Sequence, residues 1–219
     1  MRLAELWRYP VKSMAGERLE AAALTGDGLD GDRVAWVEDP RGGLVTARTR
    51  PRLLGHHATL GPDGGVLVDG RPWDDAAVAR DVALAADDGA RLVTRGGERR
   101  FDVLPLLVAT DGAIAAMGLD LRRFRPNVVV SGVEGLAEEG WPGKYLAVGD
   151  VVIGVARLRP RCVMTTYDPD TIAQDHGVLR DIVRRFEGRL CLNASVVKSG
   201  SIQLGQSVTL IPRESVNRR

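Results

Sequence analysis

The sequence of 219 residues has only two cysteines, three histidines and three lysines, and 5% of it is aromatic. The two cysteines, Cys162 and Cys191, cannot close a structural zinc site, and in a reducing compartment we expect them to be free thiols. No apolar run approaches the length of a membrane span, and the N-terminus lacks the apolar core of a signal peptide. The net charge of +1 gives no sign of a nucleic-acid partner or a charged membrane surface. We therefore expect a globular protein, located in the cytoplasm, that binds neither nucleic acid nor membranes.

Arginine and glycine are the residues present in excess. The chain has 27 arginines against three lysines, so an arginine alone carries no functional meaning. The 26 glycines favour a β architecture rich in turns. Over the first ninety or so residues, short strand-like segments such as DRVAWVED and GGVLVDG alternate with Gly-Asp and Asp-Gly turns. This spacing predicts a β-barrel or sandwich. The segment 74–90 is compatible with either a short helix or a loop.

Two later segments carry helix signals within what we predict to be a mainly β fold with a few helices. In the first, Thr110 is a suitable N-cap and Gly118 a suitable stop. The second begins after Asp175 and ends before Gly188, with two arginines in its last turn. Its apolar positions fall at i, i+3, i+4 and i+7, and we expect this face to be buried: Leu179, Ile182, Val183 and Phe186.

The stretch RLRPRCVMTTYDPDT (157–171) surrounds one of the two cysteines with polar residues. Arg159 and Arg161 place fixed positive charge beside Cys162, which favours a nucleophilic or metal-binding thiolate. A buried, inert thiol is an equally acceptable interpretation of the local sequence. Cys191 lies in the apolar segment GRLCLNASVV, and there we favour a core position.

Two other stretches have the chemistry to bind an anion. YPVKSMAG (9–16) places Lys12, Ser13 and turn amides directly after a predicted strand, a set that can hold a phosphate group. We expect Lys12 to face solvent when no ligand is bound. RRFRPNVVVSG (122–132) places Arg125 and Asn127 on either side of a proline just before a strand, and an arginine can bind carboxylate or phosphate through two hydrogen bonds. An exposed hairpin turn and a surface arginine are the plain alternatives.

Taken in chain order, these stretches resemble the MOSC family, which is named after the C-terminal domain of molybdenum cofactor sulfurase. YPVKSMAG and GLDGDRVAWV are similar to the β-barrel domain that accompanies it, and RFRPNVVV, EEGW, LRPRCVMTTYDPDT and GSIQLGQSVTLI are similar to the MOSC domain itself. The resemblance covers nearly the whole chain. It implies a smaller N-terminal β domain over residues 1–95, followed by a MOSC β-barrel domain over residues 96–219.

The resemblance also implies a molybdenum cofactor. In molybdenum-binding relatives, the cysteine of the RCxxTTxDPxT motif binds the metal, and a pterin dithiolene supplies two further sulfurs. The implied ligand of the metal is therefore Cys162. The residues implied to contact the cofactor, the first two of them at its phosphate, are Lys12, Ser13, Arg33, Arg125, Asn127 and Arg161. We expect Asp168 and Thr171 to shape the turn after the cysteine.

The chain departs from its amidoxime-reducing relatives in the stretch FDVLPLL. Leu104 stands where those relatives tend to have a small hydroxyl residue, so one polar contact near the pterin is missing. Asp102 matches an acidic residue near the metal and joins Cys162 as a candidate catalytic residue. The sequence contains no cysteine-rich ferredoxin domain, so we expect electrons to come from a separate donor protein of the ferredoxin, cytochrome or flavin reductase type.

Three functions are compatible with these features. The first is an oxidoreductase that reduces small N-hydroxylated substrates at a molybdenum centre, with the redox step carried by the cofactor. The second is a sulfur carrier that holds a persulfide on Cys162. The third is a protein that binds and stores molybdenum cofactor without turnover. We favour the first, because a sulfur carrier would not need the residues that match the phosphate end of the cofactor.

Overall fold

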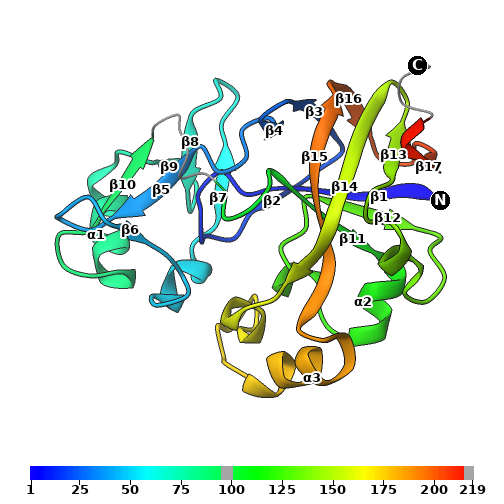
Figure 1. The fold of residues 1–219 in the computed structure, drawn as a ribbon. Helices are drawn as coiled ribbons and strands as arrows, with labels where there is room; N and C mark the ends of the chain where they lie inside the picture. Colours follow the sequence, from blue (N-terminus) through cyan, green and yellow to red (C-terminus); the bar gives the residue numbers. More distant parts are fainter. Residues whose placement is uncertain (95–100, 215–219) are drawn as a thin grey trace.

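The computed structural model describes residues 1–94 and 101–214, and the predicted domain boundary at residues 95 and 96 lies outside them. The fold is mainly β, as predicted, with three α-helices and four short 3₁₀ helices in the described parts (Figure 1). The first residues of the chain lie beside β17 (Val208–Ile211), the last strand, and an isolated bridge links Arg2 with Ser207 (Figure 1).

An eight-stranded sheet forms the larger part of the molecule. In spatial order its strands are β17 (Val208–Ile211), β13 (Tyr145–Val148), β14 (Val151–Pro160), β15 (Arg189–Lys198), β11 (Leu106–Thr110), β12 (Val128–Ser131), β1 (Arg2–Arg8) and β2 (Glu17–Leu19). All neighbours are antiparallel except β11 and β12, which run parallel. The two longest strands, β14 and β15, pair through three register shifts, and the chain leaves β14 at Pro160. Such irregularities bend a strand and redirect the chain at its end.

Three smaller sheets complete the β structure. The first contains β10 (Arg91–Thr94), β5 (Ala35–Glu38) and β6 (Leu44–Val45). The second contains β16 (Gly200–Gln203), β3 (Ala21–Thr25) and β4 (Gly28–Leu29), and the third contains β7 (Ala58–Leu60), β8 (Val66–Val68) and β9 (Arg71–Pro72). Although β1 comes first in the chain, it lies in the large sheet, so the N-terminal segment joins both parts of the molecule (Figure 1).

Three groups of buried apolar side chains hold these layers together. One is formed mainly by side chains of the large sheet and includes the fully buried residues Leu6, Ile153 and Leu192. A second fills the smaller N-terminal part around Val37 and Val82. The third lies between the large sheet and the helices of the C-terminal half. Burial of apolar area of this kind is the main favourable term in folding.

The helices begin and end where local chemistry dictates. In α2 (Asp111–Met117), Thr110 accepts a hydrogen bond from the backbone amide of Ala113 at 3.0 Å, and Gly118 closes the helix with φ 63°. Both positions confirm the prediction. The segment 74–90 contains a helix, α1 (Ala76–Ala85), because Asp75 caps the free amide of Ala77.

Helix α3 (His176–Phe186) is present as predicted, but the predicted buried face is partly wrong. Ile182 and Phe186 are buried as expected, whereas Val183 is 58% exposed and Leu179 is only half-buried. The buried face runs instead through Val178, Ile182 and Phe186, at i, i+4 and i+8. The helix is rotated so that this stripe meets the apolar cluster that contains Phe124 and Leu190.

The 3₁₀ helices connect the larger elements and lie close to the candidate site. They are η1 (Pro51–Gly55), η2 (Leu121–Arg123), η3 (Ala137–Gly140) and η4 (Val163–Thr166). Helix η4 follows Cys162 directly and packs against α3. None of the helices in the described part of the chain is long and apolar enough to span a membrane.

Candidate functional site

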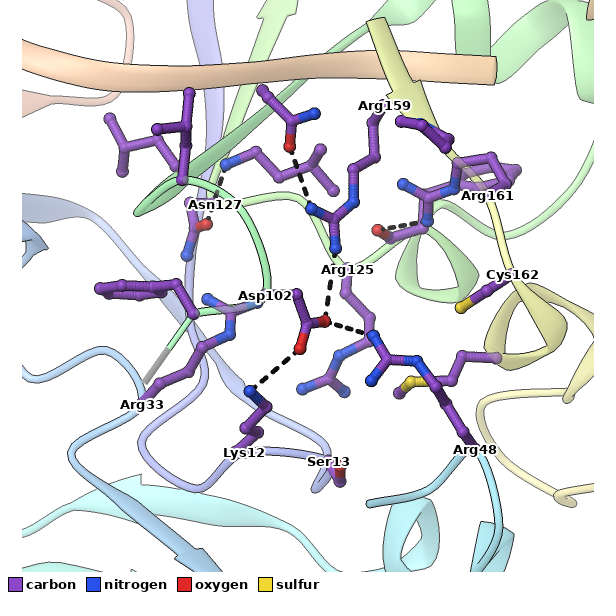
Figure 2. Close-up of a pocket in the computed structure, with 18 of the residues that line it drawn as sticks. Lys12, Ser13, Arg33, Arg48, Asp102, Arg125, Asn127, Arg159, Arg161 and Cys162 are labelled. Atoms are coloured by element: carbon purple, nitrogen blue, oxygen red, sulfur yellow. Dashed lines mark hydrogen bonds and ion pairs between the residues drawn. The ribbon is translucent and has the colours of Figure 1, made fainter. Parts of the chain in front are cut away.

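A cavity of about 90 Å³ opens where loops from several distant parts of the chain meet (Figure 2). These loops are the turn after β1, the turn before β5, the segment before β11, the start of β12 and the end of β14. All eight residues singled out from the sequence line this cavity: Lys12, Ser13, Arg33, Asp102, Arg125, Asn127, Arg161 and Cys162. The structure therefore brings together side chains separated by up to 150 positions in the sequence.

The charge of the lining is strongly one-sided. Seven cationic side chains of the described part of the chain line this cavity, which we call the arginine cavity: Lys12, Arg33, Arg48, Arg123, Arg125, Arg159 and Arg161. Among the described lining residues, Asp102 is the one carboxylate. Such a lining is suited to a ligand with more than one negative charge.

Three of the residues that line the arginine cavity have an unusual backbone. Ser13, Arg33 and Arg125 adopt φ angles of 75°, 51° and 56°, in the left-handed region that disfavours residues with a side chain. Each position costs on the order of 1–3 kcal/mol, which the surrounding fold must offset. Strained residues of this kind gather at binding and active sites. Their occurrence at three lining positions indicates that these side chains are held in place for a purpose other than stability.

Asp102 lies at the centre of the cation cluster (Figure 2). Its carboxylate forms ion pairs with Lys12 at 3.0 Å, with Arg159 at 3.4 Å and with Arg48. Burial alone would raise the pKa of Asp102, but the hydrogen bonds and charges of Arg48 and Lys12 outweigh it and lower the pKa to about 2. Near neutral pH this carboxylate is therefore ionised and can accept a proton but not donate one.

Lys12 is not exposed, contrary to our expectation. Its residue is 7% exposed, and its ammonium group is turned inward to Asp102. Ser13 is buried beside it and accepts a hydrogen bond from the backbone amide of Ala47 at 3.0 Å. The turn is inward-facing because Val11 bridges to Ala35 and Ala15 to His57. Lys12 and Ser13 thus belong to the wall of the arginine cavity rather than to a surface hairpin.

Arg33 and Arg125 are organised around one aromatic ring. The guanidinium of Arg125 lies 4.2 Å from the ring centre of Tyr9, and that of Arg33 lies 5.3 Å from it. Arg33 is also paired with the buried carboxylate of Asp32, which in turn accepts the backbone amide of Tyr9 at 2.8 Å. Burial lowers the pKa of Arg125 to about 10, partly offset by Tyr9, so this side chain still carries its charge at neutral pH.

Asn127 is buried and bonded to backbone on both sides. Its side-chain oxygen accepts the amide of Leu107 at 3.1 Å, and its side-chain nitrogen donates to the carbonyl of Trp7 at 3.2 Å. Backbone hydrogen bonds link Asn127 to the same two residues. Asn127 therefore ties together β1, β11 and β12 at the edge of the arginine cavity.

Cys162 is half-buried at the start of η4, facing three guanidinium groups. The positive charges of Arg48, Arg159 and Arg161 act on the sulfur. Thr165 fixes the backbone here through two hydrogen bonds to the Cys162 carbonyl. Cys162 is therefore an accessible thiol in a positive environment.

Cys191 has the opposite surroundings. It is 1% exposed in the third apolar cluster, and burial raises the pKa of its thiol to about 11 despite the nearby charge of Arg161. The core position expected for Cys191 is confirmed.

Several buried donors in the arginine cavity have no protein partner among the described residues. They are Nη2 of Arg125, Nε of Arg161 and Nδ2 of Asn193. An unpaired buried donor costs about 1–3 kcal/mol, so each is expected to have a partner in the functional state. Two of these donors belong to arginines and one to an amide, and together with the surrounding cations they fit a ligand rich in negative acceptor oxygens, such as a phosphate ester.

The turn after Cys162 is built as the sequence predicted. The carboxylate of Asp168 accepts the backbone amides of Asp170 and Thr171 and the hydroxyl of Thr171, at 3.0–3.1 Å. Asp168 also pairs with Arg123 at 2.9 Å. These bonds hold η4, and with it Cys162, against η2.

The sequence did not single out several residues of the arginine cavity. Arg48 is bonded to Asp102 and places its charge near the Cys162 sulfur, and Asn193 accepts a hydrogen bond from Arg159 at 3.1 Å. Arg48 lies in the segment TARTR, and among 27 arginines nothing local distinguishes it. Leu104 also lines the cavity, at the position where a hydroxyl was missing from the sequence pattern.

The described residues contain no group of three or more histidine, cysteine, aspartate or glutamate side chains that could hold a metal ion. The protein itself therefore offers one soft ligand, Cys162, rather than a full coordination set. A metal bound here would need other ligands from a cofactor. The excess of cations and unpaired donors around Cys162 is compatible with such an anionic cofactor.

Comparison with known proteins agrees with this arrangement. Residues 1–101 match the MOSC N-terminal beta barrel domain, and residues 108–209 match the MOSC domain. Mitochondrial amidoxime reducing component 2 of Bos taurus is 25% identical over 94% of this chain and 82% of its own length. Human mitochondrial amidoxime-reducing component 1 is 27% identical over 77% of this chain and 67% of its own length.

Among solved structures, the YUAD protein of Bacillus subtilis superposes with a TM-score of 0.52 over 95% of this chain and 94% of its own, at 14% identity. This likeness concerns the fold. The two domain matches together cover nearly the whole chain, and the protein belongs to the MOSC family, with an N-terminal MOSC β-barrel domain followed by a MOSC domain.

Proposed function

We propose that this protein binds a molybdenum cofactor in the arginine cavity and reduces small N-hydroxylated compounds. The observation that carries the proposal is the position of Cys162. It is a half-buried thiol that faces a cavity whose described residues supply seven cations, one carboxylate and three unpaired buried donors. The distant similarity to amidoxime-reducing components supports the choice of substrate class.

We assign the residues of the arginine cavity to two groups, one that would bind the metal and one that would bind the rest of the cofactor. Cys162 would bind the metal through its sulfur, a soft ligand that suits molybdenum. Lys12, Ser13 and Arg33 would hold the phosphate of the cofactor, and Arg125 and Arg161 would bind the remaining acceptor oxygens through their free donors. Asn127, whose amide is bonded to backbone on both sides, would position the strands that carry these residues.

The proposed reaction consumes two electrons and two protons for each N–O bond that is cleaved. The substrate R–NH–OH accepts them and leaves as R–NH₂, with the oxygen released as water. The cofactor would supply the two-electron chemistry. Asp102 cannot donate either proton near neutral pH, since its pKa is held at about 2. Its proposed role is to orient Lys12, Arg48 and Arg159, and the protons would come from water.

Electrons would come from a separate donor protein of the ferredoxin, cytochrome or flavin reductase type. The two cysteines lie in unlike places, one in the arginine cavity and one in the core. They cannot ligate an iron–sulfur cluster, which needs four protein ligands.

The test is metal analysis of the protein produced in a host that makes molybdenum cofactor. We expect about one molybdenum per chain in the wild type and in Cys191→Ser, and little or none in Cys162→Ser, because a hydroxyl is a harder ligand. Reduction of an N-hydroxylated substrate with an artificial electron donor should follow the molybdenum content. Cys191→Ser is the matched control, since it changes the same residue type in the core.

Two results would replace the proposal. Molybdenum without any reduction of N-hydroxylated compounds would indicate a protein that stores the cofactor. No molybdenum, together with the addition of one sulfur to Cys162 by a cysteine desulfurase, would indicate a sulfur carrier. Intact mass spectrometry distinguishes that product by the mass of one sulfur atom.

A further inference from the structure

A second cavity, of about 340 Å³, lies beside the arginine cavity and has a different character. Its walls are largely aromatic and apolar, formed by Trp7, Tyr9, Leu54, Met164, Tyr167 and Pro169. We call it the aromatic cavity. It shares Arg123, Arg125 and Met164 with the arginine cavity, so these side chains form a common wall.

Most charged groups in the wall of the aromatic cavity are already neutralised. Glu17 pairs with Arg8 at 2.8 Å, Arg122 pairs with Asp120 and Asp170 at 2.7–2.8 Å, and Arg123 pairs with Asp168. These groups are occupied in holding the wall together. A ligand therefore needs no charge to neutralise these groups.

Two polar atoms at the aromatic cavity remain unpaired within the described structure. The hydroxyl of Tyr9 is buried without a hydrogen-bond partner, and its residue is 2% exposed. Nη2 of Arg125 is also buried without a partner. The guanidinium of Arg125 lies 4.2 Å from the Tyr9 ring centre, so the two donors belong to one stacked pair. A buried hydroxyl without a partner is costly, and a ligand acceptor would relieve that cost.

The ring of Tyr9 packs closely against the backbone at Gly16. A side chain at Gly16 would lie 2.5 Å from the Tyr9 ring and 2.2 Å from the carbonyl of Arg8. Gly16 therefore permits the close approach that fixes the ring. The backbone amide of Tyr9 is held by Asp32, and its ring is stacked on Arg125. A phenol that is held in place by its neighbours but donates no hydrogen bond to the protein is expected of a residue that binds a ligand.

We propose that the aromatic cavity is a second ligand site, for a small planar aromatic molecule that carries a hydrogen-bond acceptor. The ring of the ligand would pack between Trp7, Tyr167 and Met164, and its acceptor would receive a hydrogen bond from Tyr9 Oη. Aromatic walls with a few converging donors are typical of small-molecule sites. This site does not depend on the proposed function, because no metal or cofactor takes part in it.

Benzamide is the probe of choice, because it joins an aromatic ring to a neutral amide acceptor and is not drawn to the arginine cavity by charge. We expect benzamide to bind the purified full chain in solution, as measured by a chemical-shift titration of the tryptophan indole signals. Cyclohexanecarboxamide has the same acceptor but no aromatic ring, and it should bind roughly 3- to 10-fold more weakly.

Tyr9→Phe removes one oxygen and keeps the ring. We expect it to weaken benzamide binding by roughly 5- to 10-fold, the effect of losing one hydrogen bond. The same variant should melt at an unchanged or higher temperature without ligand, because an unpaired buried hydroxyl is removed. Tyr145→Phe on β13, a tyrosine outside both cavities, is the matched control and should leave the affinity unchanged.

The proposal is overturned if benzamide and cyclohexanecarboxamide bind equally, or if neither binds at millimolar concentrations. It is also overturned if Tyr9→Phe binds benzamide as tightly as the wild type. A loss of thermal stability in Tyr9→Phe would show that the hydroxyl serves the fold instead. Loss of molybdenum binding in Cys162→Ser tests the other proposal and leaves this one untouched.

Discussion

At the scale of single residues, the two cysteines illustrate how environment determines the chemistry of one side chain. Cys162 is half-buried beside three guanidinium groups, whereas Cys191 is enclosed by apolar residues such as Ile182 and Leu190. Burial raises the pKa of Cys191 to about 11, so almost none of it is thiolate near neutral pH.

We therefore predict that an alkylating reagent modifies Cys162 and spares Cys191 in the native protein. Peptide mass spectrometry after brief exposure to iodoacetamide would measure the modification of each residue. In denaturant, where burial is lost, both cysteines should react. Preferential labelling of Cys191 in the native protein would contradict this assignment and would leave Cys162 as an inert thiol.

Asp102 links its charge state to the stability of the fold. Its pKa is lowered from 3.8 to about 2, so the ion pairs stabilise the folded protein above the unfolded pKa and are lost as pH falls toward 2. We predict that Asp102→Asn lowers the free energy of unfolding by about 1 kcal/mol at pH 7, because solvent screens the ion pairs of a carboxylate whose side chain is 30% exposed. The difference from wild type should shrink as pH falls from about 4 to 2.

Denaturant unfolding at pH 7, 4 and 3 would measure this difference. Asp150→Asn, at an exposed position in the turn after β13, is the control and should match the wild type throughout. A difference for Asp102→Asn that stays constant from pH 7 to pH 3 would show that its carboxylate charge does not stabilise the fold.

At the scale of secondary structure, the sequence contained more information about where elements lie than about which side they bury. Thr110, Gly118 and Asp175 marked the helix ends correctly, because capping is local chemistry. The buried face of α3 was misplaced by one position. Two overlapping apolar stripes share Ile182 and Phe186, and the contacts of α3 with η4 and the sheet decide between them.

We predict that the two faces of α3 respond differently to the same kind of truncation. Phe186→Ala should destabilise the protein by roughly 3 kcal/mol, because a buried ring is removed from the third apolar cluster. Val183→Ala should change stability by less than about 0.5 kcal/mol, because that side chain is 58% exposed. Equal effects in thermal or urea unfolding would contradict the rotation of the helix seen here.

The sequence predicted a residue of the candidate site only where that residue lies in a recognisable motif. Cys162, Arg125 and Lys12 lie in recognisable stretches, and all three line the arginine cavity. Arg48 lies in no such stretch. It pairs with Asp102 and lies near Cys162, and both residues are far from it in the sequence. The inward turn of Lys12 was missed for the same reason. Its partner Asp102 is 90 positions away, and only the tertiary fold brings the two together.

At the scale of the whole molecule, the arginine cavity lies between parts of the chain that fold into different sheets. Arg33 and Arg48 come from the segments around β5 and β6, whereas Arg159 lies at the end of β14 in the large sheet and Arg161 directly follows that strand. An anion bound between them would attract both parts at once. It would bind only the folded protein, and it should therefore stabilise it.

We predict that pyrophosphate raises the melting temperature of the protein and that added sodium chloride reduces the effect. The stabilisation equals RT ln(1 + [L]/Kd), which is about 2.7 kcal/mol at a ligand concentration 100 times Kd. Arg161→Ala, which removes one cation and one unpaired donor, should weaken the effect. A melting temperature that pyrophosphate leaves unchanged, at matched ionic strength, would show that the cations do not form an anion site.

Ser13, Arg33 and Arg125 have a left-handed backbone that glycine would adopt at a lower energy, whereas ligand binding needs their side chains. Glycine would relax the backbone, yet it would remove the side chain that lines the arginine cavity. We predict that Arg33→Gly is more stable than Arg33→Ala by about 1 kcal/mol, since both lose the guanidinium and only alanine keeps the strain. Unfolding in urea would measure the difference, and equal stability of the two variants would refute it. The backbone at position 33 would thus be relaxed by glycine, whereas the buried Asp32 carboxylate and the lining of the arginine cavity both require arginine.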